Sequence, residues 1–118
     1  MFSMIEIYKE KIRDLFRPKT PSENLKIKDD KSGGTMIQNL HKEIVYSKQN
    51  VLKLLLKGEK RRTVHEVLGN GGDIQKSSRS HVIIMFEIMQ KFPNDKEKRG
   101  VLNLVDLACS EKVKIINI

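Results

Sequence analysis

Apolar and polar positions alternate over several short segments of the chain, a pattern typical of β-strands with one exposed face. Residues 4–8 alternate roughly and are predicted to form the first strand. Residues 25–28 and 35–40 are predicted to pair as a hairpin, because the turn between them, residues 29–34, carries two adjacent glycines. Residues 9–16 fit either a strand or a helix on pattern alone.

One segment has helical spacing instead. Ser47 is predicted to cap the N-terminus of a helix, and the basic residues 60–62 suit its C-terminal end. Residues 70–73 are predicted to form a loop. The broad apolar face of the helix is formed by Val51, Leu52, Leu54, Leu55 and Leu56.

The last third of the chain contains two more predicted strands. Residues 82–89 are predicted as a strand, and residues 92–99 as a polar connection. Residues 101–108 form a mainly apolar strand, of the kind that is buried on both faces. Strands of this number and order, with one helix between them, predict an α/β or α+β fold with a mixed sheet.

The composition is that of one small domain with a basic surface. The 118 residues are 38% hydrophobic and 32% charged, and the formal net charge is +8. This charge favours an acidic partner: nucleic acid, an acidic membrane or an acidic protein surface. Two Tyr, four Phe and no Trp give no evident stacking platform, so we expect no nucleic-acid partner. We expect no membrane span, because no apolar run has the necessary length, and the single cysteine fits a reducing compartment.

Two groups of polar residues carry the candidate chemistry. The first, residues 77–81 (SSRSH), is predicted to lie on a loop directly before a strand. The second, residues 106–111 (DLACSE), directly follows the apolar strand, at the end where α/β folds place phosphate- or metal-linked chemistry. Hydroxyl groups and an arginine on a loop suit phosphate oxygens and a magnesium ion.

These groups resemble two motifs of the kinesin motor domain. Residues 77–81 match its switch I motif, SSRSH, and residues 106–111 match its switch II motif, DLAGSE, except at Cys109. Residues 5–15 are similar to the family's strand LEIYNEKIRDLL, and residues 102–108 match LNLVDLA. The four matches follow one another in the family's order and cover nearly the whole chain.

The resemblance implies both a fold and a function. Residues 1–118 would form a partial kinesin motor domain with an α/β fold, a partial P-loop NTPase-like mixed sheet with one main helix. The whole motor would couple ATP hydrolysis to movement along microtubules. By resemblance, Arg79 and Glu111 form a salt bridge between the switches. The positions that would bind ATP are Ser77, Ser78, Asp106 and Cys109, and those that would hold Mg²⁺ are Ser78 and Asp106.

The sequence also departs from the family pattern. It contains no GxxxxGK[ST] phosphate-binding loop, which in the family precedes the strand that residues 5–15 resemble. Cys109 stands where the family has a glycine whose N–H meets the terminal phosphate, and Ile74 stands where asparagine is usual. Without the loop there is no backbone nest for the phosphates, so we expect the chain alone not to be ATPase-competent.

The resemblance further implies tubulin as the partner, in the cytoplasm and on the cytoskeleton. Lys26, Lys28 and Lys31 on the predicted hairpin would meet its acidic surface. The strand at residues 101–108 would leave an open sheet edge through which the chain self-associates. Two alternatives are a non-catalytic basic module that binds microtubules or another partner, and a truncated product without independent function.

Overall fold

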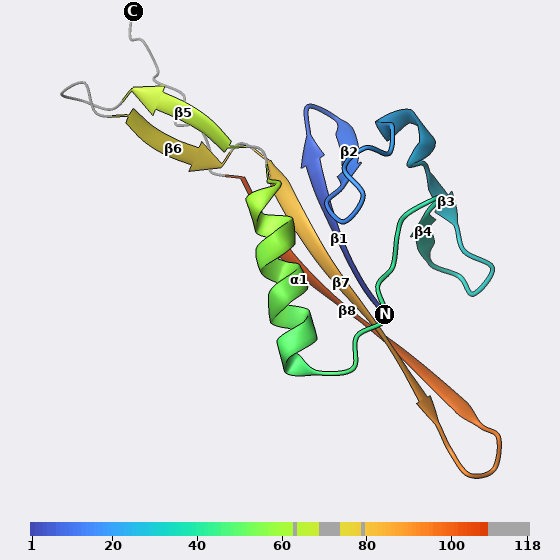
Figure 1. Cartoon of the computed structure of the whole chain (residues 1–118). Coiled ribbons are helices and arrows are strands. Elements are labelled where there is room, and N and C mark those ends of the chain that lie inside the picture. Colours follow the sequence, from blue (N-terminus) through green and yellow to red (C-terminus); the bar gives the residue numbers. More distant parts are fainter. Residues whose placement is uncertain (63, 69–73, 79, 109–118) are drawn as a thin grey trace, which may run out of the picture.

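The computed structural model describes residues 1–62, 64–68, 74–78 and 80–108. Its largest element is a four-stranded sheet in the order β2-β1-β7-β8 (Figure 1). These strands are β1 (Phe2–Tyr8), β2 (Lys11–Asp14), β7 (His81–Lys91) and β8 (Glu97–Asp106). The remaining elements are the pair β3 (Ile27–Asp29) and β4 (Thr35–Ile37), the pair β5 (Val64–Leu68) and β6 (Ile74–Ser78), the helix α1 (Lys48–Lys60) and a 3-10 turn at Ser22–Asn24.

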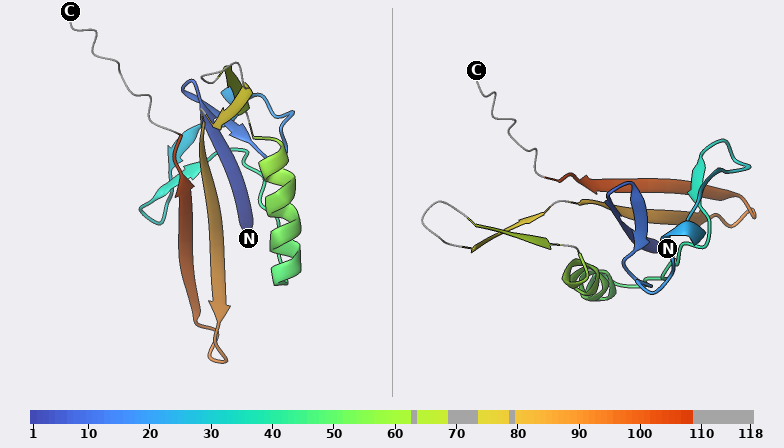
Figure 2. Two further views of the ribbon diagram at one scale, coloured as in Figure 1. Left: turned by 90° about the vertical axis from the view of Figure 1, so that its left-hand side faces the viewer. Right: turned by 90° about the horizontal axis from the view of Figure 1, so that it is seen from above.

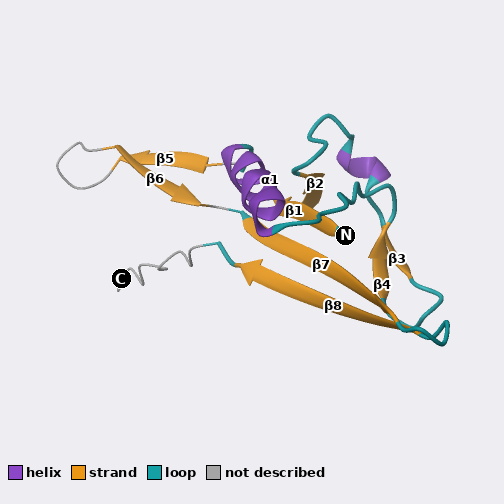
Figure 3. Cartoon of the chain, turned by 60° about the horizontal axis from the view of Figure 1, so that its bottom comes forward, coloured by secondary structure: helices purple, strands orange, loops and turns teal. Residues whose placement is uncertain are grey.

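The predicted first strand, hairpin, helix and two C-terminal strands are all present. Every pair of neighbouring strands in the described part is antiparallel, so the expected mixed sheet shows no parallel pair there. Figure 2 shows α1 on one side of the sheet formed by β1, β7 and β8. The β3–β4 pair lies apart from the helix (Figure 3).

The β1–β2 hairpin reverses direction through two residues only. Tyr8 pairs with Lys11, and the intervening Lys9 and Glu10 have φ angles of 49° and 62°. Two successive residues with positive φ are the mark of a type I′ turn, which matches the twist of the strands it joins. Residues 9–16, which fit a strand or a helix on pattern alone, therefore continue as a strand after a reversal.

Helix α1 begins as predicted. The Ser47 hydroxyl oxygen accepts a hydrogen bond from the Asn50 backbone N–H at 3.2 Å. Gly58 is the buried residue of the helix and lies against Met4 of β1, whose sulfur would collide with a Cβ at position 58. Glycine thus lets the helix approach the sheet closely at this point.

The hydrophobic core lies between α1 and the sheet. It is formed by the buried side chains of Met4, Leu15 and Val82, and Leu55 of α1 packs against them. No helix in the described residues is long and apolar enough to cross a membrane.

Strand β8 differs from its prediction. The apolar sequence predicts a strand buried on both faces, but all ten residues of β8 are exposed. Leu102 and Leu104 are each 48% exposed, and Val105 is 56% exposed. The burial on both faces that the apolar sequence is typical of is not reached, because α1 covers β1 instead. The open edge expected for this strand is present in the described sheet, where β8 is the edge strand. The strand also begins early, at Glu97, inside the segment predicted as a polar connection.

The carboxylate of Asp14, at the end of β2, is fully buried. It accepts three hydrogen bonds of 2.9–3.1 Å from the backbone N–H groups of Phe16, Arg17 and His41. These bonds hold the turn after β2 against the segment that leads to α1. Farther along this segment, Glu43 exchanges two backbone hydrogen bonds with Phe2, at 2.7 and 2.8 Å. These bonds hold the segment beside the start of β1.

Replacing Asp14 is therefore expected to be costly. Asp14→Ala leaves three N–H groups without their acceptor, and we expect the free energy of unfolding to fall by about 3 kcal/mol or more. Asp29→Ala removes an exposed carboxylate and is the matched control, with an expected change within about 0.5 kcal/mol. Urea denaturation measures both, and equal losses would contradict the role of Asp14.

A chain of charges joins three parts of the molecule through Glu87 of β7. Glu87 pairs with Lys42 and, at 3.3 Å, with Arg99 of β8, which also lies 3.6 Å from Asp30 in the β3–β4 turn. Burial raises the pKa of Glu87, but hydrogen bonds and charges from Lys42 and Arg99 outweigh it and lower the pKa below its ordinary 4.5. The pKa of Asp30 is also lowered, mainly by the hydrogen bond from the Ser32 hydroxyl and to a smaller extent by Arg99.

This network predicts how stability depends on pH. Because the folded-state pKa of Glu87 lies below its unfolded value, its ionised form stabilises the fold at neutral pH, and this contribution is lost as the pH falls through 4.5 and below. Glu87→Gln should thus be less stable than wild type at pH 7, but lose less stability between about pH 5 and pH 3.

Urea denaturation over a pH series tests this expectation. Glu97→Gln is the control, because Glu97 is 53% exposed and lies 3.8 Å from Lys91 at the surface. This control should follow the wild-type curve. Identical acid slopes for wild type and Glu87→Gln would count against the network.

Candidate functional site

Asp106 ends β8, where it lies opposite Val82 of β7. Arg62, two residues beyond α1, donates from Nη1 to Asp106 Oδ2 at 2.6 Å and from Nη2 to the Ser80 carbonyl oxygen at 2.9 Å. The Arg62 side chain is 9% exposed, whereas that of Asp106 is 64% exposed. The group formed by Arg62, Ser80, His81, Asp106 and Ala108 is called the Arg62 junction below.

A second contact closes the junction. The Ala108 backbone N–H donates to His81 Nδ1 at 2.9 Å. Because Nδ1 accepts this bond, the proton of the neutral imidazole is on Nε2. His81 therefore anchors the chain that follows β8 to the start of β7, beside the fully buried Ser80.

The site residues predicted from the sequence do not all lie in the Arg62 junction. Asp106 lies in the junction, at the strand end where the sequence predicts it. Ser77 and Ser78 are the last two residues of β6, where their backbones pair with His65 and Val64. The prediction of a loop is wrong for these two serines, because β5 provides a partner strand that the sequence analysis did not predict.

Other predicted positions cannot be placed in this way. Arg79, Cys109 and Glu111 lie outside the described residues, as does the loop predicted at residues 70–73. The junction nevertheless joins the two motif groups, because Ser80 belongs to the first and Asp106 to the second.

The three lysines predicted to face tubulin are exposed on or beside the β3–β4 hairpin: Lys26, Lys28 and Lys31. Two carboxylates, Asp29 and Asp30, lie on the same hairpin and offset part of the positive charge. The pair between Arg99 and Asp30 connects this hairpin to β8.

Comparison with known proteins adds to this geometry. The family model described as Kinesin motor domain matches residues 1–117. This chain belongs to the kinesin motor domain family.

Two curated kinesins illustrate the relationship. Kinesin-related protein 5 of Dictyostelium discoideum is 45% identical over 111 residues, which cover 94% of this chain and 11% of that protein. The kinesin heavy chain of Syncephalastrum racemosum is 44% identical over 112 residues, again 94% of this chain and 11% of the relative. The chain therefore spans about a tenth of the length of these relatives.

A solved structure supports the same assignment. A fast kinesin, studied for its ATPase mechanism and its interactions with microtubules, matches with a TM-score of 0.76 and 34% identity. The match covers 99% of this chain and 32% of the fast kinesin chain. The α/β fold is thus that of part of a kinesin motor.

Arg62 links the two kinesin motif groups, and sequence reasoning did not single it out. The basic residues 60–62 were assigned to the C-terminal end of the helix, an interpretation that explains their charge without any distant contact. Arg61 also has a distant partner, since its Nη1 donates to the carbonyl oxygens of Leu15 at 2.8 Å and Phe16 at 3.0 Å. Nothing in the local sequence indicates that Arg62 reaches a strand end 44 residues later.

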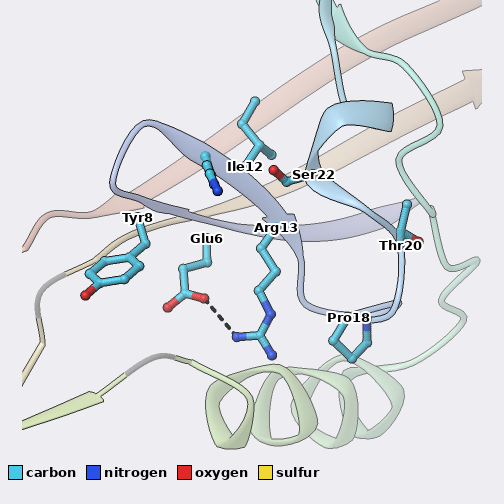
Figure 4. A pocket seen from close by; sticks show the side chains of 8 residues that line it. Glu6, Tyr8, Ile12, Arg13, Pro18, Thr20 and Ser22 are labelled. Atoms are coloured by element: carbon cyan, nitrogen blue, oxygen red, sulfur yellow. Dashed lines mark hydrogen bonds and ion pairs between the residues drawn. The ribbon is translucent and has the colours of Figure 1, made fainter.

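A pocket of about 280 Å³ opens beside the β1–β2 hairpin (Figure 4). Arg13 spans it, with Nη1 lying 3.2 Å from the buried Glu6 carboxylate and donating to the Arg61 carbonyl oxygen at 2.9 Å. These contacts join the hairpin to the end of α1, so we assign the charged wall of the pocket a structural role. The lining residues are Glu6, Tyr8, Lys11, Ile12, Arg13, Pro18, Thr20 and Ser22.

The described residues do not by themselves fit Mg²⁺ or a nucleotide. One Asp106 oxygen accepts from Arg62, and no group of three or more His, Cys, Asp or Glu side chains gathers within this part of the chain. Magnesium needs several oxygen ligands in near-octahedral geometry, usually including substrate phosphates. The junction supplies one carboxylate and a link between two motif groups, and we derive no catalytic step from it.

The asymmetric burial of the Arg62 pair predicts asymmetric effects of mutation. Arg62→Gln is expected to lower the free energy of unfolding by about 1–3 kcal/mol, because Asp106 and the Ser80 carbonyl both lose a charged donor. Asp106→Asn should cost less than about 1 kcal/mol, because the carboxylate is mostly exposed and Arg62 keeps its bond to Ser80. Urea denaturation compares the variants, and a larger loss for Asp106→Asn would refute this order.

Proposed function

We propose that residues 1–118 are the central part of a microtubule-based, ATP-dependent kinesin motor domain. The observation that carries this proposal is the Arg62 junction, in which one arginine contacts Ser80 of the first motif group and Asp106 of the second. A motor that opens and closes its switches needs these two segments side by side. The family match over residues 1–117 supports the same function.

In the longer motor, the two groups would serve the nucleotide. Arg79 and Glu111 would form the salt bridge that joins the switches. Ser77, Ser78, Asp106 and Cys109 would lie at the ATP phosphates, with Ser78 and Asp106 at the magnesium ion. To reach the ion, Asp106 would have to exchange its Arg62 partner, and its exposure leaves room for that.

The chain alone is proposed not to hydrolyse ATP. These 118 residues contain no GxxxxGK[ST] loop, and Cys109 stands in the place of the family's glycine. Phosphoryl transfer depends almost entirely on positioning and charge stabilisation, so the missing phosphate cradle removes most of the catalysis.

Tubulin is the proposed partner, with the cytoplasm and cytoskeleton as the location. The exposed Lys26, Lys28 and Lys31 support contact with an acidic surface. The same lysines favour a second candidate function, a basic module that binds microtubules regardless of nucleotide.

Self-association through the β8 edge is also proposed. Edge strands present unpaired backbone groups, and the apolar side chains of β8 are about half exposed. Association would bury this surface.

A chimaera tests the motor proposal. Residues 1–117 replace the matching segment of a complete kinesin motor, and ATP turnover is measured with and without microtubules. We expect microtubule-stimulated turnover in the chimaera, a loss of at least about a hundredfold in its Asp106→Asn variant, and none above background for the chain alone. A folded but inactive chimaera would overturn the motor proposal, and stimulated turnover by the chain alone would overturn its inactivity.

Pelleting with microtubules separates the second candidate. The triple variant Lys26→Ala, Lys28→Ala, Lys31→Ala should pellet less than the control triple Lys53→Ala, Lys57→Ala, Lys60→Ala, which makes the same charge change on the exposed side of α1. Equal losses would mean that overall charge alone governs binding.

A further inference from the structure

We propose that Thr20 is a phosphorylation site for a proline-directed serine/threonine kinase, and that Arg13 takes up the phosphate. Thr20 and Pro21 lie between β2 and the 3-10 turn at Ser22–Asn24, in a segment to which the motor proposal gives no role. Of the three prolines in the sequence, Pro21 alone follows a hydroxyl residue, because the other two follow an arginine and a phenylalanine.

The residues around Thr20 select the class of kinase. Proline has no backbone N–H, so Pro21 lacks the donor that any other residue would offer directly after the acceptor. Kinases that accept proline there have a substrate groove that does not need this donor, and many of them also favour a proline two residues before the acceptor. Pro18 occupies that position. The sequence Pro18-Lys19-Thr20-Pro21 therefore favours a proline-directed enzyme.

The fold presents this segment in an extended form at the surface. Pro21 is exposed and has φ −60° and ψ 138°, which is the polyproline II conformation. Its ring also disfavours the helical region for Thr20. The Thr20 backbone N–H donates to the Arg17 carbonyl oxygen at 3.0 Å and closes one turn. A single bond of this kind opens easily, so the half-buried Thr20 side chain can enter a kinase active site.

The reaction is a phosphoryl transfer from ATP bound to the kinase. The Thr20 Oγ1 forms a bond to the γ-phosphorus, and the bond from that phosphorus to the β–γ bridging oxygen breaks. ADP leaves with the bonding electron pair, and the hydroxyl proton passes to the catalytic aspartate of the kinase. Thr20 thereby gains a charge of about −1.5 to −2 at pH 7 and three strong acceptor oxygens.

The pocket beside the β1–β2 hairpin offers the phosphate a place. Thr20 and Arg13 both line it, and Figure 4 shows the Arg13 side chain between Glu6 and Pro18. The pocket volume of about 280 Å³ is several times the roughly 30 Å³ that one water occupies, so a phosphate group fits. Among the lining residues two cations, Arg13 and Lys11, accompany one carboxylate. The Arg13 side chain is 39% exposed and can reach a new partner.

Uptake of the phosphate would change what Arg13 holds. Its Nη1 donates to the Arg61 carbonyl oxygen at 2.9 Å, at the end of α1. A phosphate competes for this donor, because hydrogen bonds between charged groups are about twice as strong as those between neutral ones. Phosphorylation is therefore expected to release the Arg61 carbonyl and to loosen the last turn of α1, directly before Arg62. The modification thus reaches the Arg62 junction, and only this last step rests on the proposed function.

Phosphorylation of the folded chain tests the site. The chain is incubated with a mitogen-activated protein kinase and MgATP, and the modified residue is located by mass spectrometry. We expect phosphate on Thr20, at a rate within about tenfold of that for a peptide of residues 12–28, because the turn opens easily. Pro21→Ala should slow the reaction by about tenfold or more. Pro93→Ala, the same change where no hydroxyl residue precedes, is the control and should leave the rate unchanged.

The same experiment distinguishes a second class of kinase. Arg17 lies three residues before Thr20, a spacing favoured by kinases that select basic residues. Arg17→Gln should lower the rate by less than about threefold, because a proline-directed enzyme does not need this cation. A larger loss for Arg17→Gln than for Pro21→Ala would overturn the kinase class. A peptide that is modified while the folded chain is not would overturn the site.

Phosphorus-31 NMR of the modified chain tests the role of Arg13. A cation beside the phosphate favours its dianion, so the second phosphate pKa should lie about 0.5 or more below its value of about 6 in the peptide. Arg13→Gln should abolish this difference, whereas the exposed Arg17 serves as the control, and Arg17→Gln should retain it.

Hydrogen exchange in the wild-type chain gives a second readout, which stands even if Arg13→Gln does not fold. Phosphorylation should speed exchange of the amides of residues 59–62 by about threefold or more and leave residues 51–55 unchanged. An unshifted phosphate pKa together with unchanged exchange would overturn the role of Arg13 and leave the Thr20 site standing. Neither readout involves ATP turnover by this chain or microtubules, so the motor proposal is judged separately by the chimaera.

Discussion

The buried carboxylate of Asp14 fixes the course of the chain between the first hairpin and α1, because it accepts N–H groups from both sides of that connection. From His41 the chain passes along the start of β1 and enters α1 at Ser47. The helix then lies over Met4, and Gly58 lets it come close. The end of α1 finally brings Arg62 to the start of β7 and the end of β8. The candidate site thus depends on hydrogen bonds that fix the chain before it enters the helix.

The Arg62 junction combines a fixed partner with an exchangeable one. Arg62 is almost buried and also bonds to the Ser80 carbonyl, so it keeps its place if Asp106 leaves. Asp106 is mostly exposed, so a competing donor or cation could take over its carboxylate with little desolvation. This asymmetry would permit the exchange of partners proposed for Asp106 in a longer motor, whereas a symmetric buried pair would resist it.

Local sequence predicted those parts of the fold that depend on local physics. Alternation predicted β1 and the β3–β4 hairpin, a mainly apolar run predicted β7, and the Ser47 cap predicted the start of α1. The β1–β2 turn escaped prediction because Lys9 and Glu10 adopt positive φ without the glycine or asparagine that usually marks it.

The candidate site was predicted less completely, for physical reasons. The motifs placed Asp106 correctly at a strand end. Ser77 and Ser78 suggested a loop by their polarity, but the backbone pairing with β5 decides their conformation. The apolar sequence of β8 is typical of a buried strand, but it does not show whether other elements of this chain pack on the faces of that strand. Arg62 contacts Asp106, which is 44 residues later in the chain, and no local sequence pattern predicts such a contact.

The sheet order has a consequence for how the chain folds. The β1–β2 and β7–β8 hairpins are local, and they are joined by the pairing of β1 with β7, which runs from Phe2 opposite Phe86 to Ile7 opposite His81. This pairing closes a loop that contains α1 and both small hairpins, so it is expected to form last and to limit the folding rate. During synthesis, β1 leaves the ribosome roughly eighty residues before its partner strand, which corresponds to about 4–16 s. Throughout this interval the apolar face of the first hairpin has no β7 to pack beside, and it is then that the nascent chain most needs protection from other chains.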